Sequence, residues 1–299
     1  MKEDESIEKS NTTGLIMYAS DPELDPLTFE LVTNVKVGDR VTMGSSACGT
    51  CRACLRGEDK GCVEHFLNFS LKGGFYGPGG FAEYKVHRSD GVFNVGDAPW
   101  DQAALAEPLS CAIHAARLLG ARLGDTAVVF GAGTMGLLNL MVLKMSGLRV
   151  GVVDVNEGRL AKAKTLGADV ILRSGTDIRD RVKAAFLGGV DYSIAAYGSE
   201  EVNQDALDVL NARGKICLFA SAHPVTPFSI DPNLMHNRET SAVGVVSADR
   251  RDHAVATNLI ATGQIDLSPI IDATFPILDA AEAFHRATSA PSYRVMLNP

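Results

Sequence analysis

The chain has 299 residues, of which 46% are hydrophobic and 21% are charged, and its formal net charge is -8 at pH 7. The length favours two domains, the composition is typical of a globular protein, and the negative charge disfavours nucleic acid and anionic lipid as partners. No run of about 18 apolar residues occurs, so the sequence predicts no membrane-spanning helix.

The amino-terminal part is polar at first and then weakly β-prone. Residues 1–13 are rich in charge, which indicates a mobile arm and not the apolar region of a signal peptide. Residues 14–19 and 27–33 flank a turn rich in Pro and Asp and predict a short hairpin. The chain has six cysteines, and without a signal peptide they favour a reducing compartment, so the expected location is the cytoplasm.

Residues 35–97 are short, β-prone segments rich in Gly, and we expect a barrel-like β domain with strands at 35–41 and 81–86. This region contains Cys48, Cys51, Cys54 and Cys62 in the spacing C-x2-C-x2-C-x7-C. Four thiolates so placed can enclose a zinc ion tetrahedrally, and a closed shell of this kind is structural, since it leaves no position for substrate. An iron–sulfur cluster and unligated thiols are the alternatives. Cys111 and Cys217 lie in apolar segments and are interpreted as core residues.

The pattern changes near Trp100, where residues 102–119 have helical spacing with Pro108 near the helix start. After Asp125 strands and helices alternate, which predicts a doubly wound α/β fold with a parallel sheet. The predicted strands are 126–130, 149–154, 169–172, 191–195, 214–220, 270–274 and 293–297. The predicted helices include 135–145, 157–166, 253–262 and 280–288.

The first of these strands runs into Gly131-Ala132-Gly133-Thr134-Met135-Gly136, a G-x-G-x-x-G motif followed by an apolar helix. This context predicts a dinucleotide site: Gly131 permits the tight turn, Gly133 lets the pyrophosphate approach the backbone, and Gly136 lets the helix pack on the strand. The phosphates would lie at the positive end of the helix. The alternative is a Gly-rich turn in another doubly wound protein.

Asp154 closes the next strand, at the position where an acidic side chain accepts hydrogen bonds from the adenosine ribose. A 2′-phosphate would meet a like charge there, and the next two residues, Val155 and Asn156, offer no cation. NAD is therefore expected in preference to NADP, although Arg159 lies nearby and weakens this argument.

The chain resembles the zinc-containing medium-chain alcohol and polyol dehydrogenases, in particular the sorbitol and threonine dehydrogenase branch. The resemblance covers about residues 35–299. Its residues are Val37-Gly38-Asp39-Arg40-Val41, the four-cysteine lobe, Gly79-Gly80-Phe81-Ala82-Glu83-Tyr84, Glu107-Pro108-Leu109 with His114, the Gly131 to Gly136 turn, and Asp154-Val155-Asn156 with Arg159-Leu160.

The resemblance implies a GroES-like catalytic domain at 14–104 and 252–299, with a structural zinc lobe at 44–66, and a Rossmann NAD-binding domain at 105–251. It implies that Gly131, Gly133, Thr134, Met135, Gly136, Asp154 and Arg159 bind the cofactor, and that the four clustered cysteines hold zinc. It places Glu107 beside the catalytic zinc or its water, although Glu107 is equally interpreted as a helix N-terminal carboxylate favoured by the helix dipole. It also implies a homo-oligomer, either a dimer or a tetramer.

The sequence departs from this family where the catalytic zinc is bound. The family takes a Cys and a His from the segment before Val37-Gly38-Asp39-Arg40-Val41, but residues 1–47 contain neither residue type. We therefore expect a truncated barrel and no ordinary catalytic zinc.

Three functions remain open. The first is an oxidoreductase on a small hydroxylated or carbonyl substrate, in which a side chain handles the proton. The second is a redox-neutral enzyme of the epimerase type, and the third is a non-catalytic NAD-binding sensor or assembly subunit. Glu107 and His114 are the candidate catalytic residues, with His65 and His87 behind them, and each histidine has an alternative interpretation as an ordinary surface or core residue.

Overall fold

The computed structural model describes residues 35–44, 47–64, 70–71, 75–76, 87–222, 224–225, 227–289 and 292–298. The chain forms two compact units, one made of the residues up to Glu107 together with Asp249–Pro299, the other of Pro108–Ala248. The boundaries expected from the sequence were at 104/105 and 251/252.

The second unit is built on a six-stranded sheet in which every pairing is parallel. Its strands are β5 (Thr126–Phe130), β6 (Arg149–Asp154), β7 (Val170–Arg173), β8 (Val190–Ala195), β9 (Leu210–Leu218) and β10 (Ser241–Gly244). They lie in the order β10-β9-β8-β5-β6-β7. The chain moves outward from β5 to β7 and then returns to the other side of β5. The sheet therefore has a topological switch point between β5 and β8.

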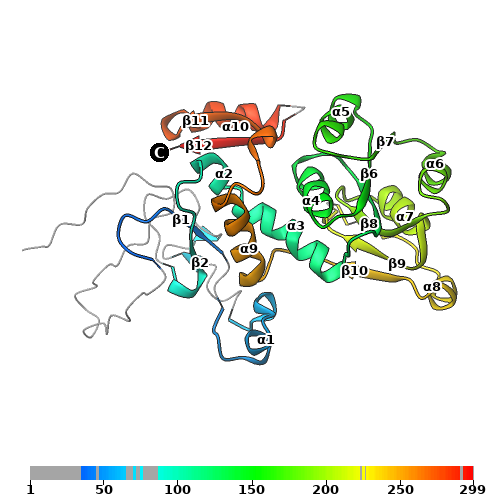
Figure 1. Cartoon of the computed structure of the whole chain (residues 1–299), viewed down its shortest axis with the longest axis horizontal. Helices are drawn as coiled ribbons and strands as arrows, with labels where there is room; N and C mark the ends of the chain where they lie inside the picture. Colours follow the sequence, from blue (N-terminus) through cyan, green and yellow to red (C-terminus); the bar gives the residue numbers. More distant parts are fainter. Residues whose placement is uncertain are drawn as a thin grey trace, which may run out of the picture. The chain divides into compact units, whose positions relative to one another are not determined.

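Helices connect these strands (Figure 1). The connections are α4 (Thr134–Met145), α5 (Glu157–Thr165), α6 (Ile178–Ala185), α7 (Glu200–Asp208) and α8 (Pro232–Arg238), of which α8 has no buried residue, and α3 (Ala106–Leu119) leads into β5. Ile178 and Val182 of α6 and Ala206 of α7 share a buried cluster with Phe130 and Ile216 of the sheet. Residues 127–130 of β5 are all buried, as expected for a parallel strand covered on both faces.

The first unit has three small sheets among its described residues. β1 (Val41–Met43) pairs antiparallel with β4 (Val92–Asn94), β2 (Ser70–Leu71) pairs antiparallel with β3 (Phe75–Tyr76), and β11 (Ile271–Pro276) pairs parallel with β12 (Arg294–Asn298). Its helices are α1 (Arg52–Leu55), α2 (Trp100–Ala103), α9 (Arg250–Ala261) and α10 (Ala280–Thr288), with short 3-10 turns η1 (Asp59–Gly61), η2 (Ser89–Gly91), η3 (Ser268–Ile270) and η4 (Ile277–Asp279). Among the described residues, no helix has the length and the apolar run needed to cross a membrane.

The doubly wound α/β prediction is confirmed, and the bounds of β5, β6 and α10 agree with those expected from the sequence. The strand expected at 35–41 is wrong except at Val41, which begins β1, because the residues before it form a turn: Gly38 has φ +92°, and the Asp39 side chain accepts the backbone N–H of Lys36 at 3.0 Å. The helix expected at 102–119 is two helices interrupted at residues 104–105. The expected arm at 1–13, the hairpin at 14–33, the strand at 81–86 and His65 lie outside the described residues.

Candidate functional site

The glycine motif forms the turn between β5 and α4, at the switch point of the sheet. Gly131 has φ +104°, a conformation that disfavours any other residue, and its N–H donates to the Val153 carbonyl at 2.8 Å. A Cβ at Gly131 would lie 3.4 Å from the carbonyl carbon of Ala196 and from the Tyr197 Cβ, which follow β8. The turn is therefore held between the carboxyl ends of the two strands that flank the switch point.

The other two glycines have contrasting surroundings. A Cβ at Gly136 would lie 1.8 Å from the Gly131 carbonyl oxygen, so α4 can pack on the turn only because this position has no side chain. Gly133, the N-cap of α4, has open space around its missing Cβ and no side-chain cap. Thr134 and Met135 are the first two residues of α4. The first turn of α4 has backbone N–H groups without intrahelical partners. Gly133 has no side chain that would block an anion from reaching them.

Asp154 ends β6 and is buried, with 7% of its surface exposed. One carboxylate oxygen accepts the backbone N–H of Ala132 at 2.6 Å, and the other accepts that of Asn156 at 2.8 Å. Asp154 therefore fixes the glycine turn to the start of α5, and each oxygen keeps a lone pair for a further donor. Arg159 is partly exposed in the first turn of α5, and its backbone N–H donates to the capping Asn156 side chain at 3.0 Å.

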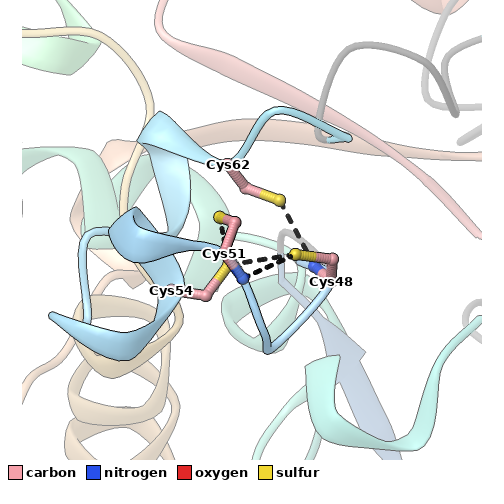
Figure 2. Close-up of side chains that lie close together, drawn as sticks. All are labelled: Cys48, Cys51, Cys54 and Cys62. Carbon is pink, nitrogen blue, oxygen red and sulfur yellow. Dashed lines mark hydrogen bonds between the residues drawn. The ribbon is translucent and has the colours of Figure 1, made fainter.

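The four clustered cysteines converge, as Figure 2 shows. Their sulfurs all lie within 4.8 Å of one another. The Sγ atoms of Cys48 and Cys54 are 3.8 Å apart, and those of Cys51 and Cys54 are 3.4 Å apart. The backbone N–H of Cys48 points at the Cys62 sulfur at 3.3 Å.

The backbone makes some of these sulfurs good thiolates. Hydrogen bonds from the backbone N–H groups of Thr50 and Cys51 lower the pKa of Cys48 to about 6, and the backbone around Cys54 lowers the pKa of Cys51. Burial has the opposite effect on Cys54 and raises its pKa to about 12. Metal ligation requires thiolates, so the Cys54 proton must leave when an ion binds.

This cluster fits a single zinc ion. Four sulfurs about 2.3 Å from one ion in a tetrahedron are separated from each other by about 3.8 Å. The observed separations of 3.8 Å and 3.4 Å need only small adjustments to reach that geometry. All four protein positions are thiols, and such a shell leaves no open position on the metal.

The two candidate catalytic residues lie on α3, seven positions and therefore about two helical turns apart. Glu107 is exposed in the first turn. His114 is buried, with 6% of its surface exposed, and its Nδ1 lies 2.7 Å from a guanidinium nitrogen of Arg117. The structure thus gives the two side chains different environments and does not bring them to one point.

The remaining candidates are placed as follows. The His87 ring nitrogens face the carbonyl oxygens of Gly44 and Arg88 at 2.9 and 3.0 Å. Cys111 and Cys217 are buried away from the cysteine cluster, and burial raises the pKa of Cys217 to about 12. Tyr197, which belongs to none of the sequence motifs, follows β8, is 65% exposed and borders the glycine turn, where its Cβ lies 3.4 Å from the Cβ position of Gly131.

Sequence comparison finds two families along the chain. Residues 21–97 match the family described as "Alcohol dehydrogenase GroES-like domain", and residues 134–262 match "Zinc-binding dehydrogenase". The L-idonate 5-dehydrogenase of Vitis vinifera is 31% identical over 89% of this chain and 74% of its own length. The D-altritol 5-dehydrogenase of Agrobacterium fabrum is 31% identical over 87% of this chain and 76% of its own length.

Among solved structures, L-idonate 5-dehydrogenase of Escherichia coli aligns with a TM-score of 0.76 at 27% identity, covering 88% of this chain and 76% of that one. The parallel sheet agrees with the fold shared with this structure, and the four clustered cysteines suit a family described as zinc-binding. The chain therefore belongs to the zinc-binding, medium-chain alcohol and polyol dehydrogenase family of oxidoreductases.

Proposed function

We propose that this protein is an NAD-dependent dehydrogenase that interconverts a small hydroxylated substrate and its carbonyl product without the usual catalytic zinc. The observation that carries the proposal is the Gly131–Gly136 turn, which lies at the switch point of the sheet and is fixed to β6 by Asp154. Ligands of doubly wound sheets bind outside the carboxyl ends of the strands at this point. The amino end of α4 offers the pyrophosphate backbone N–H groups and a favourable dipole.

NAD is preferred to NADP because of the charges around the ribose position. Asp154 carries its negative charge there, and a 2′-phosphate would be repelled by it. Arg173, the register partner of Asp154 on β7, has its Nε 3.7 Å from a Glu157 carboxylate oxygen, which offsets its positive charge. We expect calorimetry to show tighter binding of NADH than of NADPH, and the reverse order would refute this assignment.

The cysteine lobe would hold one structural zinc. The absence of Cys and His from residues 1–47 supports the lack of a second, catalytic ion of the usual kind. Metal analysis of the purified protein should therefore give one zinc per chain, and a ratio of two would contradict the proposal. Four reduced thiols also suit a reducing compartment, which supports a cytoplasmic location.

When bound, the nicotinamide supplies the acceptor or donor of hydride, and the chain itself must handle the proton of the hydroxyl group. We favour Glu107 over His114 for this role, because Glu107 is exposed whereas His114 is buried against Arg117. Glu107→Gln should lower kcat by about 100- to 10,000-fold, the usual contribution of a general acid or base, while leaving NADH affinity unchanged. The same loss of kcat in His114→Asn, with Glu107→Gln behaving as the wild type, would reverse the assignment.

The substrate class follows the relatives, whose names give L-idonate and D-altritol as substrates. We expect a secondary alcohol of a small polyol or sugar acid, and a screen of polyols, amino alcohols, sugars and enones by nicotinamide absorbance tests this. Substrate isomerisation without a net absorbance change would favour an epimerase, and tight NADH binding with no reaction would favour a sensor. We further propose a homo-oligomer, a dimer or a tetramer, which light scattering would measure.

A further inference from the structure

The fourth cysteine of the lobe is held by a different part of the chain from the other three. Cys48, Cys51 and Cys54 lie on one short stretch around α1, where the N–H of Cys51 donates to the Cys48 sulfur at 3.3 Å. Cys62 instead follows η1, and its N–H donates to the Asp59 carbonyl at 2.9 Å. Apart from the N–H of Cys48, which points at the Cys62 sulfur at 3.3 Å, the position of Cys62 therefore depends on what holds η1.

η1 is held by the amino end of α9, a segment far away in the sequence but within the same compact unit. One Asp59 carboxylate oxygen lies 3.0 Å from the Arg250 Nη2, and the other accepts the backbone N–H of Arg250 at 3.2 Å. In the opposite direction, the N–H of Lys60 donates to the Asp249 carboxylate at 3.0 Å. Three bonds thus join η1 to the first residues of α9.

The stability of this junction depends on the charge of Asp59. Asp59 is only 3% exposed, and a buried carboxylate is costly unless a cation and hydrogen-bond donors compensate it. Arg250 supplies the cation and also contacts Asp90 at 2.5 Å, while the helix N-terminus adds a favourable dipole. Without the guanidinium, Asp59 keeps the backbone N–H of Arg250 but loses its cation, so we expect Asp59 to move toward water and to shift η1 and Cys62 with it.

We propose that Arg250 is a positioning residue for the metal centre: through Asp59 it holds η1, and η1 holds Cys62 within reach of an ion bound by the other three cysteines. This rests on the proposed occupation of the cluster by zinc. Because such coupling is reciprocal, zinc binding in turn stabilises the junction between η1 and the first turn of α9.

The test compares Arg250→Met with Arg286→Met in the full zinc-loaded chain. Arg286 of α10 is the matched control, since it lies in the same compact unit, its side chain is 41% exposed, and its ion pair with Asp272 of β11 is long at 3.8 Å. Zinc affinity and release are measured with a chromogenic chelator. Removing a side chain that orients a metal ligand costs about 10- to 100-fold in affinity, which is the loss expected for Arg250→Met. Arg286→Met should change it by less than about twofold.

A second variant distinguishes the effect of an uncompensated charge on Asp59 from the effect of losing the Arg250 side chain itself. In Asp59→Asn/Arg250→Met residue 59 carries no buried charge, and Asp90 keeps its ion pair with Arg88 at 3.3 Å, so the double variant should retain zinc better than Arg250→Met alone. Hydrogen exchange provides a readout that does not depend on activity: removing zinc from the wild type should increase exchange at the amides of Lys60 and Arg250. Equal zinc retention in Arg250→Met and Arg286→Met, or unchanged hydrogen exchange at the amino end of α9 when zinc is removed, would overturn the proposal. A wild type that binds no zinc would instead refute the metal assignment on which it rests.

Discussion

Replacing the glycines of the cofactor turn one at a time should separate packing from ligand binding. Gly136→Ala places a methyl group where the Cβ lies 1.8 Å from the Gly131 carbonyl oxygen, and a normal contact requires the backbone to move by more than about 1 Å. Overpacking against backbone costs about 3 kcal/mol, the upper end of the usual range. For a unit of this size that corresponds to a fall in Tm of roughly 10 °C.

Gly133→Ala should leave the fold intact and weaken cofactor binding. Gly133 has φ -74° and ψ -175°, which alanine adopts without strain, and nothing lies within 4 Å of its Cβ position. The poorer N-cap and the stiffer unfolded chain nearly offset each other, so Tm should change by less than about 2 °C. The methyl group would occupy the space through which the pyrophosphate approaches α4. Loss of one charge-assisted hydrogen bond then weakens NADH binding by about 10- to 100-fold.

Thermal denaturation followed by circular dichroism and titration calorimetry with NADH measure the two effects on the same samples. The expected result is a crossed pattern: Gly136→Ala loses stability, and Gly133→Ala loses affinity alone. If Gly133→Ala binds NADH as tightly as the wild type, the pyrophosphate does not approach this part of the backbone. If Gly136→Ala melts at the wild-type temperature, the close packing of α4 on the turn is misjudged.

Three further predictions follow from single side chains. Asp154→Asn offers one oxygen to two backbone N–H groups and should lose about 1–3 kcal/mol of stability, measured by urea unfolding, together with NADH affinity; an unchanged midpoint would contradict this. Cys54→Ser should abolish zinc retention in metal analysis while Cys111→Ala keeps it, and retention in both would exclude the four-cysteine site. Burial lowers the pKa of His253 from 6.5 to about 4, so the neutral ring is fully stabilising above pH 6.5 and this contribution is lost as the pH falls toward 4. It amounts to roughly 3 kcal/mol. The difference in Tm between the wild type and His253→Asn should therefore shrink as the pH falls from 6.5 toward 4. A difference that does not change with pH would refute the assignment.

Much of the second unit was predictable because its signals are local. The apolar runs at 126–130 and 149–154 predicted β5 and β6 with their observed bounds, since strands buried on both faces have few polar residues. The spacing of Gly131, Gly133 and Gly136 likewise indicated the turn, because all three glycines belong to the single short connection from β5 into the first turn of α4. The prediction failed where two local signals disagreed: Val35 and Val37 suggested that the strand begins at residue 35, but Gly38 and the Asp39 side chain form a turn there and the strand begins only at Val41.

What the sequence by itself determined is therefore the set of ligand-bearing motifs, the glycine turn and the four cysteines, whose members lie close along the chain. Only the tertiary structure decided how they are held. Asp154 at the end of β6 accepts the N–H of Ala132, which follows the neighbouring strand β5. Asp59 pairs with Arg250 of α9, a helix far away in the sequence. It also decided that His114 is buried against Arg117 whereas Glu107 is exposed. Periodicity and spacing record the conformation of neighbouring residues, but the burial of a charge and the partner that compensates it depend on segments that only the folded chain brings together.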